Sequence, residues 1–397
     1  MVKARENHLP VLADHHNCTA CMACVSSCRK GALKKTIDMD GHYYINLNAG
    51  KCVGCGMCES VCPIVNEIGV GTNELKASTP YKGWSNDDSY RARGTSGGVF
   101  GAIASTFIEQ GGVVIGASLK DNECRHIAID KKEDIRLIQG SKYMYSDMAG
   151  VYGLISSCIS KGVKVLFSGL PCQVAGVLSY FRKNKNKHLI YTIDLVCGGM
   201  PSSLLLESFR KAHPKAEVVS FRSKEVYELR CAEDGKTINY GHRNILMNGF
   251  SSELTSRLSC YSCKYAHAHR CSDITLGDYW QAVKADSRGV SLMIVHNQRA
   301  SDLLAMADIH KEEALWEAFL PYNPKIVVGR TPWEHRWERR LLPRLLNGRN
   351  VYLKNLIYAS AYKKYDLPGI AYLAYKKCRS FIEHKRRLKE VETILLN

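Results

Sequence analysis

CTACMACVSSC (residues 18–28) and CVGCGMCESVC (residues 52–62) decide the fold of the first part of this chain. Both stretches space four cysteines as C-x2-C-x2-C-x3-C. At this spacing, thiolates hold cubane iron–sulfur clusters, and the fourth cysteine of each run binds the other cluster. The pattern therefore predicts two [4Fe–4S] sites. One site takes Cys18, Cys21, Cys24 and Cys62, and the other takes Cys52, Cys55, Cys58 and Cys28.

Other uses of these cysteines fit the pattern less well. Zinc sites usually pair two C-x2-C motifs across a longer gap, and disulfide frameworks are typical of small secreted domains. Gly54 and Gly56 let the second loop turn sharply. Residues 10–68 resemble bacterial-type two-cluster ferredoxins, although Arg29 stands where a proline usually follows the first run. We expect a ferredoxin domain over residues 1–68.

The chain has 397 residues, which is too long for one such module. No apolar run approaches the roughly 18 residues that span a bilayer, and the polar start does not resemble a signal peptide. Seventeen cysteines without a leader predict a reducing compartment, so we expect a cytoplasmic protein. The formal charge of +17 is concentrated in residues 330–397, which hold 16 Lys and Arg against 6 Asp and Glu.

After a polar linker over residues 69–83, short apolar stretches alternate with helical patterns. Strands are predicted at 113–117, 163–169 and 191–197, and helices at 97–110, 150–160, 173–181 and 202–212. This alternation is typical of an α/β domain, which we expect over residues 84–300. The predicted fold class is α+β, with a two-cluster ferredoxin-type domain, an α/β domain that binds flavin and a cluster, and a helical basic tail over residues 301–397.

Five ordered motifs resemble the beta-subunit family of coenzyme F420 hydrogenases and dehydrogenases. The motifs are GTSGGVFGAI (94–103), SKYMYS (141–146), SGLPCQVAG (168–176), DLVCGGMPS (194–202) and CYSCKYAHAHRCSDITLGDYW (260–280). The resemblance covers roughly residues 80–300. Behind a two-cluster ferredoxin, the layout is similar to the long members of the family. These include F420H2-oxidising subunits and the plant hydroxymethyl-chlorophyll reductase.

The resemblance implies a third [4Fe–4S] cluster held by Cys172, Cys197, Cys260 and Cys263. Cysteines at two strand ends beside a C-x2-C can converge at one edge of an α/β sheet, where such sheets bind ligands. The alternative is that the first two are ordinary buried cysteines. Cys271 follows an arginine where relatives usually carry an apolar residue, and we interpret it as a bystander. We expect four further cysteines to be structural: Cys124, Cys158, Cys231 and Cys378.

The family places FAD against a glycine turn and the SKY motif. The resemblance therefore implies flavin contacts from Ser96, Gly97, Gly98, Lys142 and Tyr143. Thr95, in the same turn, and Gly277, as a position of close approach, are further candidates. Free backbone N–H groups at the start of a helix can hold a pyrophosphate, although most such glycine turns bind nothing. His267 and His269 stay unassigned. Two departures from the family are Gly198, where a histidine is common, and Gln281, where a glycine is common.

The favoured function is an iron–sulfur flavoprotein oxidoreductase, in which ferredoxin or another electron-donor protein supplies electrons through the clusters to FAD for reduction of a small molecule. No catalytic side chain is assigned. Family members of this length occur in organisms without F420, often in surface-polysaccharide pathways. Two alternatives stay open: a coenzyme F420 hydrogenase or dehydrogenase, and an electron-transfer subunit without its own substrate.

The basic tail interleaves aromatic and cationic residues in WEHRWERRLLPRLL (333–346) and in a later helix. Three interpretations stay open: contact with an anionic membrane surface at the inner face, docking of an acidic electron-donor protein, and a solvated basic face. We expect no nucleic acid as a partner, because no recognition module is present.

Overall fold

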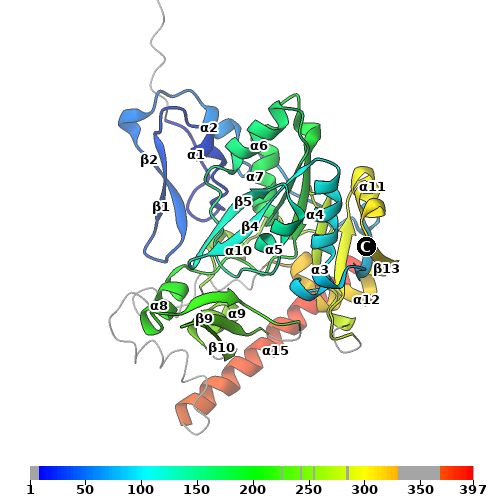
Figure 1. Ribbon diagram of the computed structural model, residues 1–397. Helices are drawn as coiled ribbons and strands as arrows, with labels where there is room; N and C mark the ends of the chain where they lie inside the picture. Colours follow the sequence, from blue (N-terminus) through cyan, green and yellow to red (C-terminus); the bar gives the residue numbers. More distant parts are fainter. Residues whose placement is uncertain are drawn as a thin grey trace, which may run out of the picture.

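The computed structural model describes residues 9–224, 227–241, 244–253, 255–282, 286–329 and 367–396, without the side chains of residues 248, 252, 367–380 and 383. Three β-sheets, of two, three and eight strands, organise this part of the chain. Figure 1 shows the N-terminal module (blue, residues 9–70) on one flank of the large sheet, and the small three-stranded sheet (green) below it. The mixed α/β architecture with an N-terminal ferredoxin-type module agrees with the predicted fold class.

The large sheet has the spatial order β13-β3-β12-β11-β7-β6-β4-β5. Its four middle strands, β11, β7, β6 and β4, run parallel, and antiparallel strands flank them on both sides. The strands are β3 (Thr79–Ser85), β4 (Val113–Lys120), β5 (Glu123–Ile129), β6 (Val165–Gly169), β7 (Ile190–Leu195), β11 (Ile274–Asp278), β12 (Ser291–Val295) and β13 (Ile309–Glu313).

The parallel strands lie where the apolar runs predicted them. All five residues of β6 are buried, because helices cover both of its faces. The four predicted helices are also present, as α4 (Val99–Glu109), α6 (Val151–Ser160), α7 (Pro171–Phe181) and α8 (Leu204–Ala212). Four more helices of this region are α3 (Asp88–Arg93), α5 (Ile135–Ile138), α11 (Gln298–Met306) and α12 (Trp316–Phe319).

Two predicted boundaries differ from the structure. Strand β3 begins inside the expected linker, and β13 pairs with β3 beyond the expected end of the α/β domain. Neither strand has an apolar run: β13 is a charged edge strand, and charge on an edge strand prevents further pairing. The backbones of β3 and β13 approach closely at Gly83, where a Cβ atom would lie 2.1 Å from the backbone oxygen of His310. The large sheet therefore extends past residue 300.

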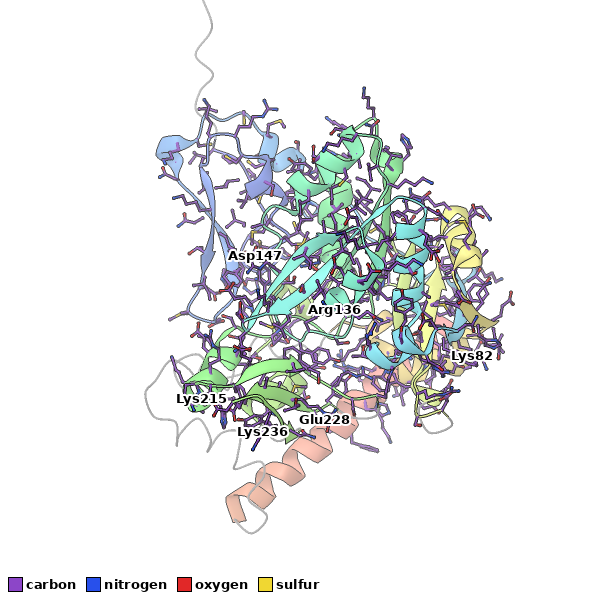
Figure 2. All side chains as sticks on the ribbon, in the orientation of Figure 1. Lys82, Arg136, Asp147, Lys215, Glu228 and Lys236 are labelled. Carbon is purple, nitrogen blue, oxygen red and sulfur yellow. The ribbon has the colours of Figure 1, made fainter. Side chains whose placement is uncertain are left out.

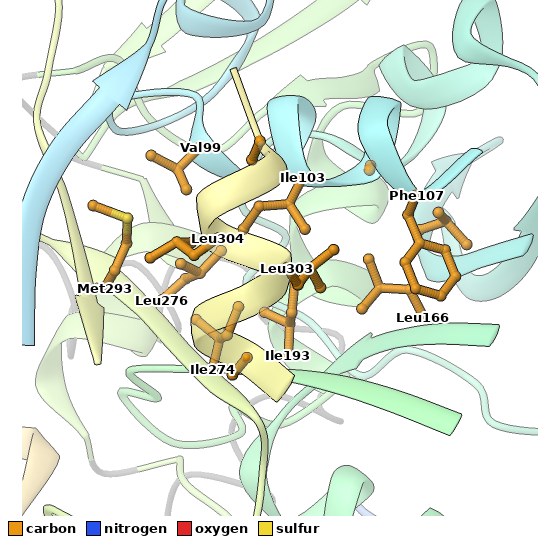
Figure 3. Close-up of a cluster of buried hydrophobic side chains, with 14 of the residues drawn as sticks. Val99, Ile103, Phe107, Leu166, Ile193, Ile274, Leu276, Met293, Leu303 and Leu304 are labelled. Atoms are coloured by element: carbon orange, nitrogen blue, oxygen red, sulfur yellow. The ribbon is translucent and has the colours of Figure 1, made fainter. Parts of the chain in front are cut away.

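Each face of the large sheet has its own core. Figure 3 shows the first, in which α4 and α11 pack on the sheet through Ile103, Phe107 and Leu303 among others. On the other face, α6 and α7 share one core with Ala20, Met22, Ala23 and Val61 of the N-terminal module. Because these module residues belong to the core of the sheet, the module is fixed to it by buried apolar contact.

The N-terminal module contains α1 (Ala23–Ser27), α2 (Met57–Ser60) and a hairpin of β1 (Leu33–Ile37) and β2 (Tyr43–Leu47). The hairpin lies along the flank of the large-sheet domain. There Lys35 forms an ion pair with Asp147, which Figure 2 labels beside the blue module. The hairpin therefore adds a polar contact to the apolar one made by the cysteine loops.

A small subdomain follows α8. It joins β8 (Glu217–Ser220), β9 (Leu229–Glu233), β10 (Lys236–Gly241) and α9 (Ile245–Ser252) around a separate core, against which Tyr143 packs. Figure 2 labels Lys215, Glu228 and Lys236 in this subdomain. The loop between β8 and β9 reaches the large sheet, as described below.

The described end of the chain is the helix α15 (Leu367–Leu396). Val391 is 1% exposed in a core with Trp316 and Phe319, and Arg387 pairs with Glu253 at 2.9 Å. The helix extends from this anchor away from the body (Figure 1). A later helix was expected here, whereas the segment 333–346 lies outside the described residues. None of the described helices has the length and apolarity needed to cross a bilayer.

Candidate iron–sulfur and flavin sites

The first cysteine site is a cavity with an empty volume of about 650 Å³, including its opening to solvent. Cys18, Cys21, Cys24 and Cys62 all line it, which is the set that the spacing predicts. Its loop turns through left-handed backbone at Ala20 (φ 54°) and Met22 (φ 64°). The second cysteine run has Gly54 (φ 62°) and Gly56 (φ 70°) at the matching positions, so both runs share one loop geometry.

The second cysteine site includes Cys55, which is exposed. Burial raises the pKa of Cys58, and the charge of the nearby Cys28 adds to this rise. Burial opposes ionisation of Cys28, but backbone N–H groups around its sulfur outweigh that effect and lower its pKa. One of these groups, the N–H of Ala32, donates to the sulfur at 3.3 Å. Cys28 is thus held in surroundings that favour the thiolate, the form that binds metal.

The third site is built by three separate segments. Cys172 lies in the first turn of α7, directly after β6, and Cys197 lies two residues after β7. Because β6 and β7 are parallel neighbours, both cysteines reach the same edge of the sheet. The helix α10 (Leu258–Tyr261) brings Cys260 and Cys263 to the same place. All four cysteines line one cavity with an empty volume of about 670 Å³, including its opening.

Burial at the third site opposes ionisation of its cysteines. Burial, followed by the nearby Cys260, raises the pKa of Cys263 to about 12. Burial also raises the pKa of Cys172 well above its usual range, and the other three cysteines add to this effect. Two N–H···S contacts of 3.3 Å, from Gly199 to Cys197 and from Met200 to Cys260, favour the thiolate. Four thiols of this kind fit a cationic iron core that displaces their protons.

The cysteines lie around the walls of these cavities. Within the described ranges, no three His, Cys, Asp or Glu side chains lie close enough to hold a single metal ion. A cubane cluster spreads its four ligands over the corners of a larger body, and this arrangement suits the two cavities.

Only a thin wall separates the first and third cavities. Thr19 lines both cavities. The hydroxyl of Tyr152 on α6 donates to the backbone oxygen of Cys21 at 2.7 Å, and that of Tyr145 donates to the oxygen of Ala20 at 3.1 Å. The first loop is thereby held against the domain that carries the third site.

Cys271 does not line the third cavity. Its sulfur would lie 2.9 Å from a Cβ atom at Gly69, and burial raises its pKa to about 12. His269 shares a hydrogen bond of 2.8 Å with Ser78, and neither His267 nor His269 lines either cavity. Cys124, Cys158 and Cys231 also lie outside both cavities, whereas the side chain of Cys378 is not described.

The predicted flavin motifs do come together. The hydroxyls of Thr95 and Ser141 are 2.9 Å apart, which places the glycine turn beside the SKY segment. The turn precedes α4, whose first turn has no side-chain cap. Lys142 donates to the backbone oxygen of Gln139 at 2.8 Å, and burial lowers its pKa to about 8.

Two of the expected flavin-contact glycines, Gly97 and Gly277, pack closely against other parts of the protein. The N–H of Gly97 already donates to the hydroxyl of Ser291 at 2.9 Å, so it is not free for a ligand. A Cβ atom there would lie 2.5 Å from the backbone oxygen of Gly83. Likewise, a Cβ atom at Gly277 would lie 2.7 Å from Val196. Both glycines are explained by close packing of the protein against itself.

Two cations of this site were missed from the sequence. The loop after β8 brings Lys224 to the glycine turn, where its Nζ donates to the backbone oxygen of Ser96 at 2.5 Å and to that of Arg91. Burial, and then the charges of Arg91 and Arg222, lower the pKa of Lys224 to about 8. Arg222 lies beside Tyr143 and pairs with Asp278 at 2.8 Å. The sequence feature that could have indicated these two cations is the short basic stretch 222–224.

The cationic cluster of Arg91, Arg222 and Lys224 carries one more charge than its two carboxylate partners, Asp278 and Asp286. An excess of buried positive charge beside a helix start fits an anionic group such as a pyrophosphate. The residues present are therefore compatible with FAD.

The fold and the cysteine sites define a class: a two-cluster ferredoxin-type module packed on a mixed α/β domain that has a cysteine site of its own. Family models match in the same order. The model "4Fe-4S dicluster domain" matches residues 11–70. The two models for the beta subunit of coenzyme F420 hydrogenase/dehydrogenase follow, with the N-terminal model matching 80–152 and the C-terminal model matching 162–316. The chain belongs to this beta-subunit family and carries a 4Fe-4S dicluster domain in front of it.

Two curated relatives are similar to parts of the chain. The F subunit of F420H2 dehydrogenase from Methanosarcina mazei is 28% identical over 193 residues, 46% of this chain and 54% of that protein. The chain thus matches about half the length of this relative. The VorC subunit of ketoisovalerate oxidoreductase from Methanothermobacter marburgensis is 34% identical over 55 residues, 13% of this chain and 70% of that protein.

Among solved structures, the chain is similar to one in the F420-reducing [NiFe] hydrogenase complex from Methanosarcina barkeri. The sequence identity is 17% and the TM-score is 0.45, with 73% of this chain and 93% of that chain covered.

Proposed function

We propose that this protein is an iron–sulfur flavoprotein oxidoreductase that passes electrons from a ferredoxin-type donor through three [4Fe–4S] clusters to FAD, for reduction of a small molecule. The observation that carries the proposal is the shared wall. Cys172, Cys197, Cys260 and Cys263 surround one cavity, and Thr19 lines both that cavity and the cavity of the first cysteine site.

The proposed electron path runs from the second site through the first site to the third. The exposed Cys55 belongs to the second site, where a donor protein has access. Cys28 and Cys24 belong to different sites but lie in one small core of the module, with Cys58. The next step crosses the wall at Thr19.

The cationic cluster supports the flavin assignment. FAD, when bound, converts one-electron transfer into two-electron chemistry at a substrate. Lys224 and Arg222 would hold the negative pyrophosphate, because their positive charges outnumber their carboxylate partners. Lys142 would place a further buried cation beside the same turn and stabilise negative charge there.

An anaerobic absorption spectrum of the purified protein tests this proposal. Reduced ferredoxin is added to one sample and reduced F420 to another. We expect iron–sulfur and flavin bands that only reduced ferredoxin bleaches within seconds. A protein without flavin would overturn the flavoprotein assignment and favour an electron-transfer subunit. A C197S variant serves as the control for transfer to the flavin, because it removes one ligand of the third site only.

Coenzyme F420 is the second candidate. The similarity to the F subunit of F420H2 dehydrogenase from Methanosarcina mazei favours it. If reduced F420 bleaches the flavin band first and the cluster bands afterwards, F420 is the substrate at the flavin. That result would overturn the hypothesis of a ferredoxin-fed reductase. It would also remove the reason to expect a role in a surface-polysaccharide pathway.

A further inference from the structure

Arg257 lies between the first and third cysteine sites. It directly precedes α10, which carries Cys260, and its side chain enters the N-terminal module. There Nη1 donates to the backbone oxygen of Cys18 at 3.2 Å, Nη2 donates to that of Tyr43, and the guanidinium lies 4.6 Å from the ring centroid of Tyr44. Arg257 also lines the third cavity. One cation therefore contacts the surroundings of both sites.

This cation is buried without a carboxylate. Arg257 is 2% exposed, forms no ion pair with any described acidic residue, and leaves its Nε without a hydrogen-bond partner. Other buried arginines of the large-sheet domain each have an aspartate. These pairs are Arg91–Asp286 at 2.7 Å, Arg222–Asp278 at 2.8 Å and Arg270–Asp194 at 3.3 Å. A buried charge without a counter-charge is strongly destabilising, so an anion is expected beside Arg257.

The cysteine sites can supply that anion. On the first-site side, the guanidinium of Arg257 donates to the backbone oxygen of Cys18, so its positive charge lies beside a cysteine of that site. On the third-site side, Arg257 is in the same short turn as Cys260, whose N–H donates to the backbone oxygen of Arg257 at 3.0 Å. Four thiolates around an iron–sulfur core carry net negative charge, which increases on reduction.

We propose that Arg257 is the shared counter-charge of the first and third iron–sulfur sites, and that it raises the reduction potentials of both. The inference rests on the cluster sites of the proposed function. A positive charge stabilises the reduced, more negative form of each cluster more than the oxidised form, so its removal shifts the potential to more negative values. None of the described contacts of Arg257 reaches the second site, around Cys28 and Cys55, so this site should not respond.

The test is a potentiometric titration of the cluster-loaded protein, followed by electron paramagnetic resonance. In R257Q we expect two of the three cluster potentials to become more negative, while that of the second site stays unchanged. R257K retains the charge and should keep both potentials near the wild-type values. S259A is the matched neutral control, because the Ser259 hydroxyl also donates to the backbone oxygen of Cys18, at 3.2 Å.

Each outcome decides the inference. Unchanged potentials in R257Q, a shift of one cluster alone, or an equal shift in S259A would overturn it. If R257Q fails to load clusters, cluster loading of R257K is the deciding measurement. Normal loading of R257K supports the need for a positive charge. Failed loading of R257K shows that the hydrogen bonds of the guanidinium matter instead, which would overturn the inference. A wild-type protein that lacks a third cluster signal would refute the proposed function itself, which separates the two failures.

Discussion

A Cβ atom at Gly176 of α7 would lie 2.8 Å from the Cβ atom of Cys21. The helix that carries Cys172 therefore touches the first cysteine loop with its backbone. The same Cβ atom would lie 2.9 Å from the hydroxyl of Tyr152, which holds Cys21 in place. The absence of a side chain at this one position allows the module to pack directly on the sheet domain.

We expect G176A to separate the module from the sheet domain. The added methyl group meets atoms on two sides, and overpacking of this kind costs about 1–3 kcal/mol. The midpoint of thermal unfolding should fall, and electron transfer from the module to the third site should slow in stopped-flow measurements. G153A is the matched control, because a Cβ atom at Gly153 of α6 meets nothing within 4 Å. Equal stability of the two variants would contradict this account.

The geometry of the third site predicts which cysteines bind iron. Cys263 lines the cavity, whereas Cys271, which is also partly buried, packs beneath Gly69. We expect C263S to lose about four of roughly twelve iron atoms and C271S to lose none, because a cubane needs all of its thiolate ligands. Iron and sulfide analysis of the two variants measures this difference. Loss of iron from C271S but not from C263S would refute the assignment.

The sequence predicts which cysteines lie together, because ligands of one cluster need a fixed spacing. The spacing of the two runs pairs Cys62 with the first loop, and the structure places it in that cavity. The positions of Cys172 and Cys197 follow from the parallel strands β6 and β7, whose apolar runs are readable without a structure. Short-range cysteine spacing and buried strands are thus the features that can be predicted from the sequence.

Residues that act across the fold leave no such pattern. Lys224 and Arg257 come from loops, and their roles depend on which distant backbone oxygens they reach. Gly97 was expected to bind a ligand, but the strand residue that occupies its N–H, Ser291, is almost two hundred positions away. Strand β13 is also hidden from sequence analysis, because an edge strand that avoids further pairing is charged instead of apolar.

Flavin binding should depend on the charge of Lys224. Its pKa is lowered to about 8, so the side chain loses its charge as the pH rises through that value. FAD should therefore bind more weakly above pH 8 than below it, and K224Q should weaken binding about tenfold at pH 7, where a charged hydrogen bond is lost. The dissociation constant is measured from flavin fluorescence.

Two variants separate charge from other effects at this site. K224R stays charged at every pH of the titration, so its affinity should depend less on pH than that of the wild type. K215Q is the control, because Lys215 pairs with Asp234 on the surface of the small subdomain. An unchanged pH dependence in K224R, or an equal loss of affinity in K215Q, would show that Lys224 does not contact the flavin.

Glu253 should anchor α15 to the body. Its carboxylate accepts from Lys325 at 2.7 Å and from Arg387 of α15 at 2.9 Å. We expect E253Q to destabilise the docked helix by about 1–2 kcal/mol, allowing for the partial exposure of Lys325. Hydrogen exchange of the α15 amides should then accelerate. E390Q removes only the exposed pair with Arg386, worth roughly 0.3–0.5 kcal/mol. If the two variants exchange equally fast, apolar contacts such as that of Val391 hold the helix without help from Glu253.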